Sequence, residues 1–189
     1  SIGNNIQFGF FEYAGYTSWV KRGDEEPLET PSNEFNQQTN YWLSYSKPLL
    51  YSWHLLDYLG EKTIDTIMHS YYADWELKHP YPKDYFSYFS KYSDKNLDWY
   101  THDVFYKTGT VDYAASIIND DAVFVNYGSL TLPFEVAFYD EKRDEISRKW
   151  FENIERVKSI PLPEGTKSII IDPDETLPDV NRSNNATSK

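Results

Sequence analysis

A chain of 189 residues, of which 40% are hydrophobic and 18% aromatic, is long enough for one large domain or two small ones. It contains no cysteine, which excludes disulfides, thiolate zinc sites and a cysteine nucleophile. The formal net charge of -12, without any run of Lys and Arg, argues against nucleic acid and anionic membranes as partners. No apolar run approaches the roughly 20 residues of a membrane span.

Residues 1–40 combine a short apolar segment with a polar stretch. Residues 8–11 are apolar, and residues 13–21 have a composition compatible with a helix. Residues 23–40 are acidic and polar, and Pro27 and Pro31 interrupt them. We therefore expect an ordered loop that runs over a surface.

Residues 45–59 give the first clear helix prediction, because apolar residues recur there at three- and four-residue spacing on one face. Gly60 follows and fits a helix end, where a positive φ is often required. The apolar stripe consists of Leu49, Trp53, Leu56 and Leu59.

Three further helices are expected before residue 110. Residues 62–75 repeat the helical spacing, and the segment from His79 to Pro82 cannot continue that helix. Pro82 suits the first turn of a third helix, and Asp84 is favourable near its N-terminus. Residues 97–105 predict a short fourth helix.

Beyond Thr110 the pattern changes to short segments rich in β-branched and aromatic residues, separated by turn-forming residues. This spacing predicts a β-sandwich of immunoglobulin or fibronectin type, about 70 residues long. The expected strands are residues 113–118, 122–127, 134–139, 147–151, 156–160 and 167–171.

These patterns predict an α+β protein of two domains. Residues 1–110 form a helical unit, with 1–40 as an irregular or helical lead-in, and residues 111–180 form the β-sandwich. Residues 181–189 are polar and are expected to form a tail that frays.

The residues that could bind a metal do not form a recognised motif. None of the four histidines lies in an HxxxH or HExxH pattern. Asp65 and His69 lie one helical turn apart and could share a metal, although an exposed ion pair is the commoner arrangement. His54 is expected to pack within its helix. Asp172 and Asp174, without the EF-hand spacing, indicate a turn after the last strand and not a calcium site.

Tyr45 is the one candidate for catalytic chemistry. It lies where the polar loop is expected to become a helix, so its hydroxyl could point into an adjoining cleft. There it could donate a hydrogen bond to a developing oxyanion. Without further context a structural role is the simpler interpretation, because Tyr45 is one of 17 tyrosines.

Four segments in order resemble the aminopeptidase-N-like gluzincins, a family of HExxH zinc metallopeptidases, and in particular its bacterial members. The run from Tyr45 to Leu50, with Leu55 to Glu61, resembles their Tyr-x-Lys-Gly motif and the helix after it. The remaining three segments are residues 75–84, the Leu-Asp-Trp-Tyr of residues 97–100, and the ending formed by residues 169–173 and 179–185.

The resemblance implies that the helical unit is the second half of a thermolysin-like catalytic domain. It assigns to Tyr45 the hydrogen bond to the tetrahedral intermediate, and Pro48 here replaces the family's glycine. The family's zinc ligands have no counterpart. The resemblance therefore implies the C-terminal part of a zinc aminopeptidase that releases N-terminal residues from peptides. Zinc would belong to the parent protein and not to this chain, and the chain alone would be inactive.

Further expectations concern location and partners. The resemblance favours a periplasmic or cell-envelope location, with a peptide as the parent's substrate. The missing half would normally cover one face of the helices, so an exposed apolar patch could produce a homodimer. The alternative to the peptidase is a noncatalytic module, helical plus β-sandwich, that binds peptides or glycans through exposed rings.

Overall fold

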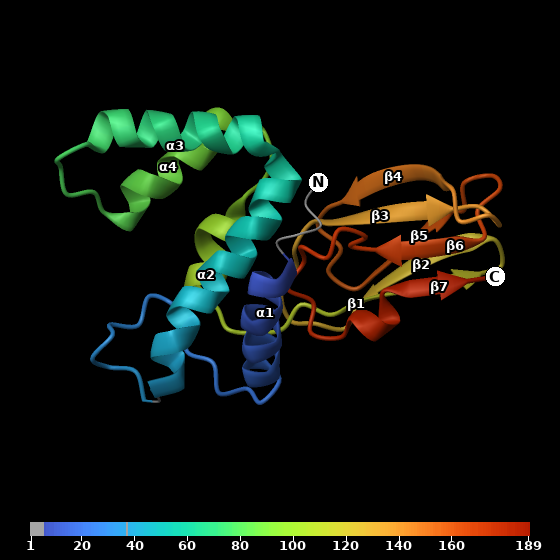
Figure 1. Ribbon diagram of the computed structural model, residues 1–189, viewed down its shortest axis with the longest axis horizontal. Coiled ribbons are helices and arrows are strands. Elements are labelled where there is room, and N and C mark those ends of the chain that lie inside the picture. The colour runs from blue at the N-terminus through green and yellow to red at the C-terminus, as the bar shows by residue number, and fades with distance from the viewer. Residues whose placement is uncertain (1–5, 37) are drawn as a thin grey trace. The chain divides into compact units, whose positions relative to one another are not determined.

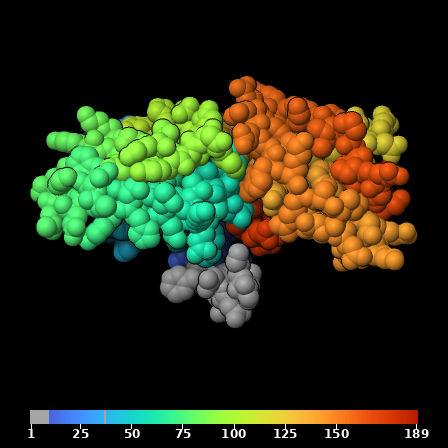
Figure 2. Space-filling view, turned by 90° about the horizontal axis from the view of Figure 1, so that it is seen from above, coloured from blue at the N-terminus to red at the C-terminus, as the bar shows by residue number. Residues whose placement is uncertain are grey.

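The structure is a computed structural model that describes residues 6–36 and 38–189. It contains α-helices and antiparallel β-strands, the latter in two sheets, so the predicted α+β class is confirmed (Figure 1). The described residues form two compact units. The first, called the β unit below, extends to Glu25 and resumes at Gly109–Lys189, and the second, called the helical unit below, lies within residues 26–108. Each can be followed by its colour in Figures 1 and 2. No helix within the described ranges is long and apolar enough to cross a bilayer.

The first unit contains two antiparallel sheets, and the predicted strands are confirmed to within two residues at each end. One sheet has the order β1-β2-β5 and the other the order β4-β3-β6-β7. The strands are β1 (Tyr113–Ile118), β2 (Asp121–Asn126), β3 (Phe134–Tyr139), β4 (Glu145–Phe151), β5 (Val157–Pro161), β6 (Ser168–Ile171) and β7 (Ala186–Ser188).

Aromatic rings from both sheets form the core of this unit. Tyr113 of β1 lies 4.3 Å from Phe134 of β3, between ring centroids, and Phe124 of β2 lies 4.9 Å from Phe151 of β4. All four rings are buried. These residues lie on the inner faces of their strands, and segments rich in such β-branched and aromatic residues identified the strands correctly.

Helix α1 (Ile6–Val20) belongs to the same unit, which differs from the predicted division at residue 110. The Tyr13 hydroxyl donates a hydrogen bond to the Asp179 carbonyl, and the Arg182 guanidinium lies 4.0 Å from the Tyr13 ring centroid. Sequence periodicity could not show this grouping, because it depends on contacts between residues more than 160 positions apart.

The prediction of a frayed tail from Asn181 is wrong. Arg182 begins a short 3₁₀ helix, η3 (Arg182–Asn184), and β7 then pairs with β6. The Ile171 amide donates to the Asn185 carbonyl at 2.8 Å, and the Arg182 guanidinium donates to the Leu177 carbonyl at 3.0 Å. Long-range hydrogen bonds thus order a segment whose polar composition alone suggested disorder.

In the second unit, α2 (Gln38–Leu59) begins seven positions before the predicted start at Tyr45. The expected helix of residues 45–59 would have placed Pro48 in its first turn, whereas the observed helix has Pro48 in its interior. Proline has no N–H, so the Ser44 carbonyl receives no helical hydrogen bond at this point.

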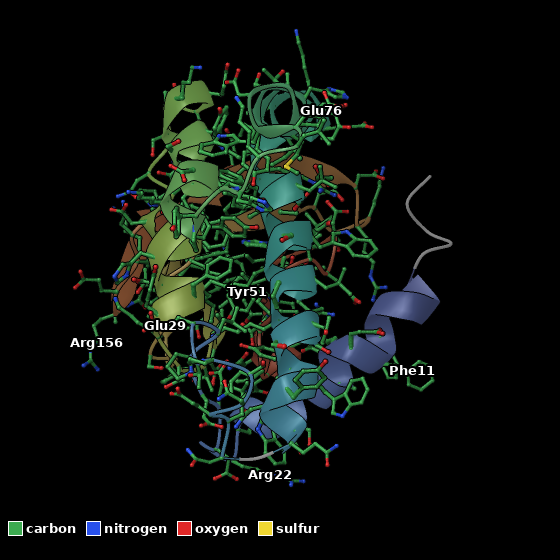
Figure 3. The ribbon with its side chains drawn as sticks, turned by 90° about the vertical axis from the view of Figure 1, so that its left-hand side faces the viewer. Phe11, Arg22, Glu29, Tyr51, Glu76 and Arg156 are labelled. Atoms are coloured by element: carbon green, nitrogen blue, oxygen red, sulfur yellow. The ribbon has the colours of Figure 1, made fainter. Side chains whose placement is uncertain are left out.

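The buried face of α2 also differs from the predicted stripe, since Leu49 and Leu56 are exposed. Apolar residues occur on more than one face of this helix, so spacing alone did not identify the packed one. Figure 3 shows Tyr51, which is fully buried, on α2 within this unit. The buried face consists of Asn40, Leu43, Lys47, Leu50, Tyr51, His54, Leu55 and Tyr58.

The other helices agree with the prediction. They are α3 (Glu61–Trp75), α4 (Pro82–Tyr92), a π-helical turn η2 (Trp99–Asp103) and α5 (Val104–Tyr106). Pro82 occupies the first turn of α4, and the Asp84 carboxylate accepts a hydrogen bond from the Tyr81 amide at 2.9 Å. These are the start signals expected from the sequence.

Candidate functional site

Tyr45 lies on the outward face of α2, in the second turn of the helix and not at its start. Its side chain is 62% exposed, and its hydroxyl lies 3.3 Å from the Tyr41 hydroxyl. The hydrogen bond with Tyr41 raises the pKa of Tyr45, with a smaller contribution from burial. The phenol is therefore protonated at neutral pH and can donate a hydrogen bond.

Lys47 points in the opposite direction. Its side chain is 1% exposed, its Nζ donates to the Lys107 carbonyl at 3.0 Å, and it lies 5.9 Å from the Tyr51 ring centroid. Two residues along a helix differ by about 200° around its axis, so Tyr45 and Lys47 necessarily face opposite sides. Lys47 therefore links α2 to the chain after α5, on the face of the helix opposite to Tyr45.

Rings adjoin Tyr45 on the exposed face of α2. The centroid of the Tyr41 ring lies 5.7 Å from that of Tyr45, at an interplanar angle of 72°. It also lies 5.7 Å from the centroid of the Trp42 ring, at an interplanar angle of 80°. Trp42 is 63% exposed, and Leu49 continues the face by one turn. Tyr41, Trp42, Tyr45 and Leu49 are called the outer face of α2 below. Tyr41 and Trp42 were not predicted from the sequence, although the spacing of residues 41, 45 and 49 is helical.

The histidines are dispersed. His54 is buried and its ring lies 5.6 Å from the Trp99 ring, which confirms that it packs within the helical unit. His102 pairs with Asp103 at 2.8 Å. Asp65 and His69 line one shallow hollow of about 360 Å³ on α3.

The described residues do not fit a zinc site. Within residues 6–36 and 38–189, no three His, Asp or Glu side chains converge on a point that could hold a metal. A catalytic zinc needs three such protein ligands. No step that requires zinc is therefore assigned to residues of this chain.

The two buried aspartates of the C-terminal segment serve the fold. The Asp172 carboxylate accepts hydrogen bonds from the amides of Thr176 and Leu177, at 2.9 and 3.0 Å, which confirms the predicted turn after the last long strand. The Asp179 carboxylate accepts from the amides of Tyr113 and Asn181, at 2.8 and 2.7 Å. Burial raises the pKa of Asp179 to about 6.

The chain matches no family model, and its sequence is not significantly similar to any curated protein. The resemblance to the gluzincins therefore rests on the four sequence segments alone.

Proposed function

We propose that this chain is the C-terminal part of an aminopeptidase-N-like zinc peptidase, which removes N-terminal residues from peptides. The proposal is carried by the arrangement around Tyr45. The segment that resembles the family's Tyr-x-Lys motif lies on a single helix, with Lys47 anchored inside and the Tyr45 hydroxyl outside. A helical unit followed by a β unit, in the order that the four segments imply, supports it further.

Tyr45 would act as a hydrogen-bond donor in that peptidase. Its exposed phenol is held by Tyr41 and is protonated at neutral pH, so it can donate to the oxygen that becomes negative during attack on a peptide carbonyl. Zinc would be bound by another segment of the parent protein. In this chain, Lys47 and Tyr41 would only position Tyr45.

The β unit would be the immunoglobulin- or fibronectin-like sandwich of the parent. Its strands are all antiparallel, and buried rings from both sheets meet between them. In this proposal it carries no catalytic group.

The outer face of α2 would lie against the zinc-binding segment in the parent protein. Without that segment, Trp42, Tyr45 and Leu49 are exposed, and a second copy could cover them. We therefore expect the isolated chain to form a homodimer that Trp42→Ser weakens. Light scattering at high concentration checks this, and a monomer in the unmodified chain would contradict the dimer.

The peptidase proposal is tested in two stages. Leucine p-nitroanilide hydrolysis by the purified chain should be absent with or without added zinc, and zinc-dependent turnover would refute the assignment. In a longer protein that includes an HExxH segment, Tyr45→Phe should lower kcat by roughly 100-fold or more with little change in KM. If no HExxH segment is encoded together with this one, the peptidase assignment fails.

A noncatalytic peptide- or glycan-binding module is the alternative, favoured by the exposed rings of Tyr41, Trp42 and Tyr45. Sugars stack best on rings that form a flat platform, whereas these rings meet at 72° and 80°. The geometry therefore suits a peptide better than a glycan. Binding of peptides to the chain, lost in Trp42→Ala and without hydrolysis, would favour this alternative.

A further inference from the structure

The four-stranded sheet contains a hollow that the proposed peptidase does not use. Its volume is about 880 Å³, and residues of β3, β6, β7 and the β3–β4 turn line it. Small-molecule sites commonly have volumes of roughly 300–1,000 Å³. The hollow lies entirely within the unit formed by residues 1–25 and 109–189.

Short side chains account for the hollow. Ser168 of β6 pairs with Ser188 of β7, and Ile170 pairs with Ala186. Residues paired across neighbouring strands point to the same face of the sheet, so two serines and an alanine lie together where larger side chains would fill the space. The hollow is therefore a consequence of residue size.

Three cationic side chains line the hollow in a chain whose net charge is -12. They are Arg143, Lys167 and Lys189, and the acidic Asp140 and Glu141 also line it. The Asp140 carboxylate accepts hydrogen bonds from the amides of Lys142 and Asp144, at 2.8 and 2.9 Å. Lys189 pairs with Asp120. Lys167 makes only the smallest of the interactions that act on the pKa of Asp120, so Arg143 and Lys167 are the cations on which a ligand would depend.

The backbones that carry these two cations are fixed by hydrogen bonds. The Arg143 amide donates to the Asp140 carbonyl at 3.1 Å, which closes the turn after β3. The Lys167 amide donates to the Tyr139 carbonyl at 2.7 Å, and the Lys167 carbonyl accepts from the Lys189 amide at 2.9 Å. A site whose backbone is already ordered loses less conformational entropy when it binds a ligand.

We propose that this hollow binds a small sugar acid, that is, a polyhydroxylated ligand with a carboxylate. Arg143 and Lys167 would bind the carboxylate, since guanidinium and ammonium groups form the strongest hydrogen bonds to such groups. The hydroxyls of Ser168 and Ser188, which lie on the same face of the sheet, both donate and accept, as sugar hydroxyls require. The apolar surface of Ile170 would contact the C–H face of the ring. This proposal is independent of the peptidase function.

The test compares digalacturonate with 4-linked galactobiose, a disaccharide of the same linkage that has CH₂OH in place of each carboxylate. Both are titrated into the full chain at about 50 mM salt, where charge interactions are weakly screened, and binding is followed by calorimetry and amide NMR shifts. Digalacturonate should bind saturably, with shifts in β6 and β7, and at least about tenfold more tightly than galactobiose. Absence of saturable binding, or equal affinity for the two sugars, would overturn the proposal.

Variants locate the site. Arg143→Gln and Lys167→Gln should each weaken digalacturonate binding by about tenfold, and Ala186→Phe should block it by filling the hollow. Lys149→Gln, an exposed cation on β4 that does not line the hollow, is the matched control and should bind as the unmodified chain does. Near-ultraviolet circular dichroism verifies folding. Inorganic phosphate binding as tightly as digalacturonate would show a site for charge alone and overturn the sugar assignment.

Discussion

Both units bury aromatic rings, but the helical unit also carries a cluster of exposed rings on one helix. In the β unit the large rings of Tyr113, Phe124 and Phe134 are fully buried between the sheets. In the helical unit Tyr51 is likewise buried, whereas Trp42 and Tyr45 on the outer face of α2 are exposed. Buried rings contribute to stability, whereas a cluster of exposed rings adds little to it and indicates a surface that another molecule covers. Mutations of the two sets should therefore affect different properties.

The largest expected effect is in the core of the β unit. Phe134→Ala removes a fully buried ring that contacts Tyr113, Phe124 and Phe151. We expect the free energy of unfolding of this unit to fall by about 3–5 kcal/mol. Urea denaturation followed by circular dichroism measures the change. Tyr127→Ala, an exposed ring after β2, serves as the control, and a similar loss there would remove the contrast between buried and exposed rings.

A smaller effect is expected inside the helical unit at Lys47. Lys47→Met keeps most of the side-chain volume but leaves the Lys107 carbonyl without this donor. The cost should be about 1–3 kcal/mol in the unfolding of this unit. The comparison is Tyr45→Ala on the outer face of α2, which should change stability by less than about 0.5 kcal/mol. If Tyr45→Ala proves the more destabilising, Tyr45 is structural and the outer face of α2 is not free for a partner.

The pH dependence of the β unit should depend on Asp179. Burial raises the pKa of its carboxyl to about 6 from 3.8, so the folded state binds this proton more tightly than the unfolded chain. The resulting stabilisation is complete below about pH 4 and is lost as the pH rises through about 6. In Asp179→Asn this dependence should be absent. The difference in unfolding free energy between the two proteins should change by roughly 1–3 kcal/mol between pH 4 and 7.

The comparison with Asp179→Asn is necessary because other carboxyls have lowered pKa values. Their contribution to stability increases as the pH rises, opposite to that of Asp179. Hydrogen bonds from Lys107 and His102 lower the pKa of Asp103 although burial opposes them, and Lys189 lowers that of Asp120. These groups are common to both proteins, so their contributions cancel in the difference. A difference that stays constant from pH 4 to 7 would show that Asp179 keeps an ordinary pKa.

The sequence predicted the features that local pattern determines, but not those that depend on tertiary contacts. Strands rich in β-branched and aromatic residues, such as residues 134–139, and helices with clear stop signals, such as the one that ends before His79, were predicted correctly because local pattern determines them. The start of α2, its buried face and the order of the segment after Asn181 depend on tertiary contacts, among them Lys47 with Lys107 and β7 with β6. Tyr45 was found only through its motif, and its neighbours Tyr41 and Trp42 follow from the three-dimensional arrangement.

The smallest expected effect concerns Leu77, in the turn between α3 and α4. Its φ is 61°, a left-handed value that suits glycine or asparagine, and its side chain is 98% exposed. The Lys78 amide donates to the Trp75 carbonyl at 2.9 Å, so the turn itself requires this conformation. The leucine side chain therefore costs free energy without compensation from packing.

Leu77→Gly should stabilise the helical unit by about 0.5–1 kcal/mol, as measured by its urea midpoint, because glycine adopts a positive φ without strain. Leu77→Ala retains the Cβ and should give no such gain, and equal stabilisation by both variants would show that strain is not the cause.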